Sequence, residues 1–162
     1  MPDGPAGAPA PARAAPFVVV GLDFGLKRIG VAAGDSLTRG ARPLGVVAAR
    51  DGAPDWPALA RYVREWGPSV LVVGVPYNMD GTTGTLTAAA REFAAELARR
   101  FALEVATVDE RLTSREAEDL LRHRRASGAR TRRVRHGDVD AAAACVLVEQ
   151  WLRALPRAPG AE

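Results

Sequence analysis

Residues 17–34, FVVVGLDFGLKRIGVAAG, hold two apolar runs separated by a short polar connection. The first run, 17–20, is rich in β-branched residues and too short for a helix, which predicts a buried strand. The second run, 29–34, predicts another strand, and the short connection predicts that the two pair as an antiparallel hairpin. Asp23 then lies where the first strand ends, beside glycines that let a ligand approach the backbone. We interpret Asp23 as a metal ligand, and the alternative is that it caps a turn.

The composition is that of an ordinary globular domain. The chain has 162 residues, of which 48% are hydrophobic and 25% charged, enough to bury one sizeable core. Cys145 is the one cysteine, so no intrachain disulfide can form, and its apolar helical surroundings predict a buried, inert thiol. No apolar run approaches the roughly 20 residues needed to cross a bilayer. We expect a disordered Pro/Ala/Gly-rich extension over 1–16, a domain over 17–153 and a tail over 154–162.

Positive charge is concentrated in one segment. Residues 122–136 contain seven arginines and no acid, so the net charge of +3 leaves −4 for the rest of the chain. Such local basicity favours contact with a phosphate backbone, and the alternative is a solvated arginine-rich loop.

Apolar runs at 44–49, 70–75 and 103–108 predict three more strands. Residues spaced three and four apart predict helices over 56–66 and 86–101, and a capping-box pattern predicts a helix from Thr113 to 121. A loop is expected over 126–137, followed by a last helix that begins at Asp138 or Asp140. This order predicts an α/β fold with a five-stranded mixed sheet, its first three strands antiparallel and helices on both faces.

Three carboxylates occupy comparable places: Asp23 and Glu110 each end a strand, and Asp140 begins the last helix. Asp140 shares a helix face with apolar residues four, seven and eleven positions later, so its side chain should point toward the sheet. Three converging acids repel one another unless a cation neutralises them, and oxygen ligands select Mg²⁺ or Mn²⁺. The alternatives are that Asp140 is only an N-cap and that Glu110 pairs with Arg111 or Arg115.

Four motifs in order, GLDFGLKRIGVAAGD, LVVGVPYNMDGTTG, VDERLTSREAE and VDAAAACVLVEQWL, resemble the YqgF family of bacterial proteins over residues 17–152. Its members are described as Holliday junction resolvases and as nucleases that mature the 5′ end of pre-16S ribosomal RNA. The resemblance implies a ribonuclease H-like fold, a cytoplasmic nuclease and an acidic site at Asp23, Glu110 and Asp140. The chain departs from the family at His136-Gly137-Asp138, where Lys-Gly-Lys is usual, and at Tyr77, where leucine is usual.

The function that we expect is metal-dependent hydrolysis of phosphodiester bonds, with two Mg²⁺ (or Mn²⁺) ions held by the three acids. The candidates for substrate binding are polar or basic residues near those acids and in the basic segment: Lys27, Arg28, Asn78, Arg111, Arg115, Arg124, Arg125, Arg132 and Arg133. Lys27 and Arg28 could equally be solvated turn charges, and Asn78 could belong to a structural turn.

The substrate stays open at this level, because DNA and RNA present the same phosphodiester. The resemblance favours pre-16S ribosomal RNA, and the alternatives are a Holliday junction or a nucleic-acid-binding module without catalysis. An actin-like phosphotransferase also uses an Asp-x-Gly hairpin, but it needs two lobes and this chain has room for one. Symmetric junction cutting would need a dimer, so monomer and homodimer both remain open. No membrane partner is expected.

Overall fold

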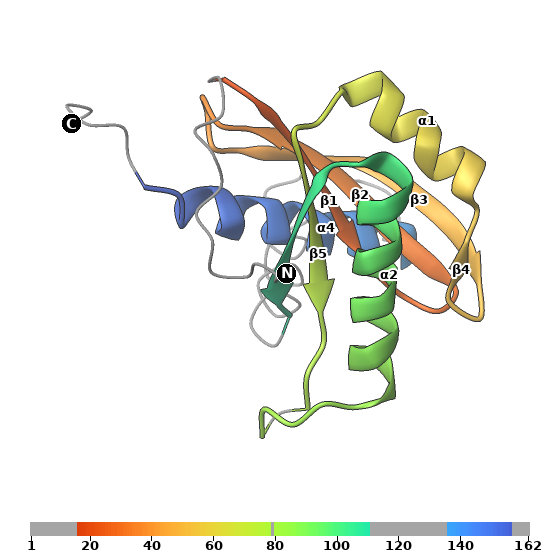
Figure 1. The fold of residues 1–162 in the computed structure, drawn as a ribbon. Coiled ribbons are helices and arrows are strands. Elements are labelled where there is room, and N and C mark those ends of the chain that lie inside the picture. The colour runs from red at the N-terminus through yellow and green to blue at the C-terminus, as the bar shows by residue number, and fades with distance from the viewer. Residues whose placement is uncertain (1–15, 79, 111–135, 157–162) are drawn as a thin grey trace.

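The computed structural model describes residues 16–78, 80–110 and 136–156 (Figure 1). Its strands are β1 (Val18–Asp23), β2 (Arg28–Asp35), β3 (Ala41–Arg50), β4 (Ala53–Pro54), β5 (Val70–Val75) and β6 (Glu104–Asp109). Its helices are α1 (Trp56–Trp66), α2 (Thr85–Phe101) and α4 (His136–Arg153). The helix expected from Thr113, the arginines from 122 to 135 and nearly all of the predicted extension and tail lie outside these residues.

The strands form one mixed sheet in the order β4-β3-β2-β1-β5-β6. As predicted, β1, β2 and β3 are antiparallel neighbours, while β5 runs parallel to both β1 and β6. The prediction of five strands was wrong by one, because the chain turns back after β3 and adds the two-residue β4. The turn uses Asp51 and Gly52 at φ of 50° and 86°, the positive values that a tight hairpin turn requires. Pro54 is tolerated there because β4 is an edge strand.

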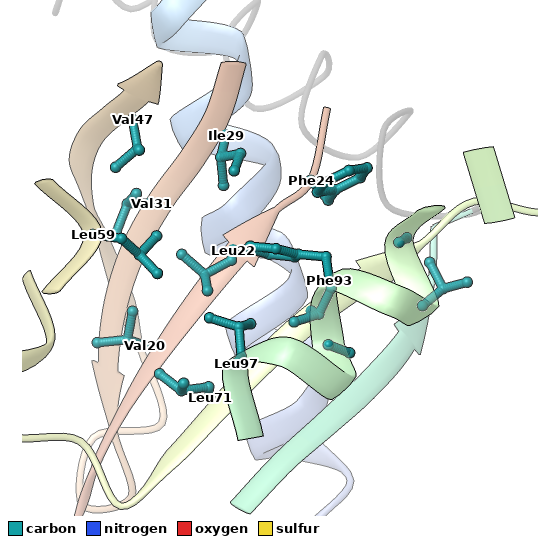
Figure 2. Close-up of a cluster of buried hydrophobic side chains, with 14 of the residues drawn as sticks. Val20, Leu22, Phe24, Ile29, Val31, Val47, Leu59, Leu71, Phe93 and Leu97 are labelled. Atoms are coloured by element: carbon teal, nitrogen blue, oxygen red, sulfur yellow. The ribbon is translucent and has the colours of Figure 1, made fainter. Parts of the chain in front are cut away.

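Helices cover both faces of the sheet, as the order of elements predicted. One apolar cluster joins the sheet to α1 and α2, and Figure 2 shows Val20, Leu22 and Leu71 of the strands meeting Phe93 and Leu97 of α2. A second cluster joins the other face to α4, with Val19 and Val72 packed against Leu147. Every residue of β5 is buried between these layers. The three tryptophans belong to these cores, and Cys145 is buried, as expected.

Helix α4 begins at His136, earlier than the predicted start at Asp138 or Asp140. The sequence suggested a loop at Gly137, since glycine costs a helix about 1 kcal/mol relative to alanine. Packing of the long apolar side of α4 on the sheet outweighs that cost. Asp140 is therefore inside the helix, and its interpretation as an N-cap is excluded.

The position of α4 is set at both ends. Near its C-terminus, Arg39 Nη1 donates to the carbonyl oxygens of Leu152 (3.1 Å) and Leu155 (3.4 Å). Near its N-terminus, the helix lies against Gly30 of β2 so closely that a Cβ there would stand 2.0 Å from the Asp140 carbonyl oxygen. Only a residue without a side chain allows this approach.

We expect Gly30→Ala to destabilise the protein by about 1–3 kcal/mol, because the added methyl group meets helix backbone that cannot rotate away. Urea unfolding of the full chain would measure this. Gly40→Ala is the matched control, since its nearest contact would be the Thr38 hydroxyl at 3.7 Å, and it should change stability by less than about 0.5 kcal/mol. Equal effects of the two substitutions would contradict the close approach of α4.

Candidate functional site

Two of the predicted acids lie at the same edge of the sheet. Because β1, β5 and β6 are parallel, their carboxyl ends meet at one edge, where Asp23 ends β1 and Glu110 directly follows β6. The Glu110 amide donates to the Val75 carbonyl oxygen at 3.0 Å, which continues the ladder by one residue. By the alternation of side chains along a strand, both acids point to the face that α4 covers.

Glu110 reaches Asp23 across the intervening strand β5. A Cβ on Gly74 would stand 2.7 Å from Glu110 Cγ and 2.9 Å from its Cδ, so the Glu110 side chain lies directly over this glycine. The two carboxyl groups are hydrogen-bonded to each other. Gly74 thus provides the gap through which the side chains meet.

Asp140 approaches the same place from the helix. Gly30, which the helix contacts at Asp140, is the residue paired with Asp23 across β1 and β2. The Asp140 carboxylate is near enough to Asp23 to raise the pKa of Asp23 by repulsion. The structure therefore places Asp140 near the contacting pair Asp23 and Glu110, and glycines on both neighbouring strands, Gly30 and Gly74, flank Asp23.

Burial is the main cause of the electrostatic state of Asp23 and Glu110. It raises the pKa of Asp23 well above its usual range, and the hydrogen bond to Glu110 and the charges of Glu110 and Asp140 raise it further. Burial also raises the pKa of Glu110, while the hydrogen bond from Asp23 acts in the opposite direction. Both shifts favour the protonated form, so this pair of carboxyl groups resists carrying two negative charges when no cation is bound.

Asp140 is neutralised differently. Arg28, the first residue of β2, donates from Nε to Asp140 Oδ2 at 2.8 Å, with 43% of the arginine side chain and 23% of the aspartate side chain exposed. The neighbouring Lys27 is exposed at the hairpin turn. Arg28 and Asp140 are 112 positions apart, so no sequence pattern links them.

Within the residues that the structure describes, no group of three or more His, Cys, Asp or Glu side chains is close enough together to hold a metal ion as it stands. The donor chemistry nevertheless fits a hard divalent cation. Two half-buried carboxyl groups in contact with each other, with a third carboxylate held nearby by an arginine, present oxygen ligands only. Asp23, Glu110 and Asp140 are the residues that would hold such an ion.

The remaining residues predicted to bind substrate are either bonded within their own turn or lie outside the described residues. Asn78 Nδ2 donates to Thr82 Oγ1 at 2.9 Å, and Asp80 accepts from the Thr82 amide at 2.9 Å, so both side chains hold the turn after β5. The unusual Tyr77 accepts a hydrogen bond of 2.8 Å from Arg91 of α2. The other binding candidates lie outside the described residues: Arg111, Arg115, Arg124, Arg125, Arg132 and Arg133.

Sequence reasoning missed Gly30 and Gly74 as parts of the site. The available signal was a glycine inside an apolar strand, which often marks a close approach of another group.

No helix in the described part of the chain is both long enough and apolar enough to span a bilayer.

The raised pKa of Asp23 predicts how stability depends on pH. The folded state binds this proton more tightly than the unfolded state, so its contribution is present at low pH and is lost as pH rises through the folded pKa. We therefore expect Asp23→Asn to raise Tm at pH 7 without divalent ions, by about 2–4 °C for each kcal/mol relieved. The difference should shrink on acidification toward the usual aspartate pKa, as followed by thermal melts.

The control for this substitution is Asp51→Asn, at an exposed turn where Asn tolerates the positive φ of 50°. It should leave Tm nearly unchanged. A lower Tm for Asp23→Asn at pH 7, or a difference that grows on acidification, would contradict the raised pKa of Asp23.

Comparison with known proteins identifies relatives across most of the chain. The family model RuvX, described as Holliday junction resolvase, matches residues 17–154. A Coxiella burnetii protein named "Putative pre-16S rRNA nuclease" is 47% identical over 137 residues, which cover 85% of this chain and 93% of the relative.

Solved structures share the fold at low identity. RuvC of T. thermophilus, in complex with a Holliday junction substrate, has a TM-score of 0.50 and 18% identity, covering 81% of this chain and 92% of its own. The Fowlpox virus resolvase, in complex with Holliday junction DNA, has a TM-score of 0.56 and 11% identity, covering 87% and 100%. The expected ribonuclease H-like fold is confirmed. Since the family model spans nearly the whole domain, the chain belongs to the RuvX (YqgF) family.

Proposed function

We propose that this protein is a metal-dependent nuclease that hydrolyses phosphodiester bonds and processes the 5′ end of pre-16S ribosomal RNA. The observation that supports the proposal is that Asp23 and Glu110 are in contact at one edge of the sheet, with Asp140 near enough to repel Asp23. Membership of the RuvX family supports a nuclease, and the name of the Coxiella burnetii relative supports the ribosomal precursor as substrate.

The three acids are assigned as the ligands of Mg²⁺ or Mn²⁺. Bound divalent ions activate water as a nucleophile and stabilise the leaving oxygen of a phosphodiester. Asp23 and Glu110 stand on strand ends, so the sheet fixes their separation before any ligand arrives. Both carboxyl groups must be deprotonated to serve as ligands, which their raised pKa opposes until a cation is present.

Basic residues are assigned to the phosphates of the substrate. Lys27 and Arg28 are exposed at the turn directly after Asp23, within reach of a backbone laid across the acids. Arg111, Arg115 and the arginines at 124, 125, 132 and 133 are proposed as further backbone contacts, which would position the nucleic acid without specifying its sequence. Asn78 is kept as a candidate contact, although its amide nitrogen is engaged within its own turn.

Cleavage of a four-way DNA junction is the second candidate function. The description of the matching family as Holliday junction resolvase favours it. Both functions use the same hydrolysis and the same acids, but paired cuts at a junction would require two copies of this chain.

We expect Asp23→Asn and Glu110→Gln to lower the rate of Mg²⁺-dependent cleavage by at least about 100-fold, because even groups that only support metal ligands cost 10–100-fold when lost. Single-turnover cleavage of an end-labelled substrate measures the rate. Asp51→Asn and Glu65→Gln remove the same charges at exposed positions and should cleave like the wild type. Full activity in Asp23→Asn would assign the cleavage to another site or to a contaminant.

The substrate is decided by side-by-side cleavage of a 16S precursor with its natural 5′ extension and a four-way DNA junction. The proposal expects the precursor to be cut at its mature 5′ end, at a rate well above that for the junction. Preferential cutting of the junction, by a dimer in sedimentation equilibrium, would instead support the second function.

Replacing Arg124, Arg125, Arg132 and Arg133 together by glutamine should weaken binding and flatten its salt dependence. Each lost phosphate contact should reduce the slope of log K against log salt by about 0.7–0.9. Fluorescence anisotropy of a labelled precursor fragment over a salt series measures this slope. An unchanged slope would leave these arginines as solvated surface charges.

A further inference from the structure

We propose that Arg28 is a displaceable counter-ion that occupies Asp140 until a divalent cation replaces it. The inference rests on the proposed metal site and adds a residue that controls how tightly the site takes its ion. It assigns to Arg28 a competing role at Asp140 that weakens ion binding, beyond a simple contact with the substrate.

The acids are neutralised by two different devices. Asp23 and Glu110 are held together by a hydrogen bond, whereas Asp140 faces the Arg28 guanidinium at 2.8 Å. Among the described residues no three-acid group is closed around a cation position. One oxygen of Asp140 is committed to Arg28, a cation of the protein itself.

The contact is built so that it can be exchanged. Toward the described residues Arg28 uses only its Nε, and 43% of the side chain is exposed, so the pair is solvated and weak. A guanidinium carries five N–H donors, and within the described part of the chain the terminal nitrogens of Arg28 meet no acceptor. These terminal nitrogens are therefore available to a phosphate, both while Nε is bonded to Asp140 and after that bond has broken.

Two cations beside one carboxylate oppose each other, so the Arg28 contact and a bound divalent ion should each weaken the other. A phosphate that draws Arg28 away would free Asp140 and strengthen ion binding, and by linkage the ion would strengthen phosphate binding by the same factor. The rival role for Arg28 is a permanent orienting partner of a ligating Asp140, as outer-sphere groups often are. That role predicts the opposite sign, because loss of Arg28 would then weaken ion binding.

The test is Mn²⁺ binding to the full-length protein by titration calorimetry, without nucleic acid. Arg28→Gln should lower the Mn²⁺ dissociation constant about five-fold or more relative to the wild type. Lys27→Gln is the matched control, because it removes the same charge one residue away without touching Asp140, and its effect should be clearly smaller. Arg28→Lys, which keeps the charge but lacks the Nε donor, should fall between wild type and Arg28→Gln, and it decides the question if Arg28→Gln fails to fold.

The outcomes distinguish failure of the counter-ion role of Arg28 from failure of the proposed nuclease function. If the wild type binds Mn²⁺ and cleaves its substrate, but the Arg28 variants bind Mn²⁺ equally or more weakly, the counter-ion role is overturned and the nuclease stands. Equal tightening by Lys27→Gln and Arg28→Gln would also overturn it, since general charge would explain both. If the wild type neither binds Mn²⁺ nor cleaves, the proposed function fails and the inference falls with it.

Discussion

The close packing of α4 on the sheet at Gly30 is the constraint on which the rest of the site depends. A helix normally stands off a sheet by the thickness of two side-chain layers, but here the Asp140 carbonyl oxygen occupies the space of a missing Cβ. Gly30 is also the cross-strand partner of Asp23. The contact between Gly30 and α4 therefore places the helix beside Asp23. Any change that lifts α4 separates Asp140 from the acids of the sheet.

Like charges gathered in this way oppose folding. Two features reduce this repulsion: the raised pKa of Asp23 and Glu110, and the pairing of Arg28 with Asp140. Burial raises the pKa of both Asp23 and Glu110, which favours their protonated forms, and Arg28 offsets the charge of Asp140. These two devices offset the repulsion among the acids without a cation, and each would have to be given up on binding of the proposed divalent ion. Under the proposed function, the stability of the fold and the affinity of the site for an ion would therefore oppose each other, which is common at functional sites.

The sequence was most informative where a short-range pattern determines structure. The helix over 56–66 and the strand over 70–75 were predicted with the bounds that the structure has, because periodicity and the flanking Asp55 and Gly67 fix them locally. The β4 strand was missed because two prolines near 54 suggested a break, although Asp51-Gly52 is a strong signal for a tight turn. The early start of α4 was missed because packing against the sheet outweighs the poor helix propensity of Gly137.

The sequence by itself determined the class of fold, the order of its elements and three acids that such an order can bring to one edge, because alternation, helical spacing and parallel strand direction are local properties. Only the tertiary structure decided how those acids meet. Three contacts join residues far apart in the chain: Glu110 lies over Gly74, α4 packs against Gly30, and Arg28 pairs with Asp140. Such contacts depend on which atoms fill a given space once the layers have packed, and no spacing along the chain encodes that.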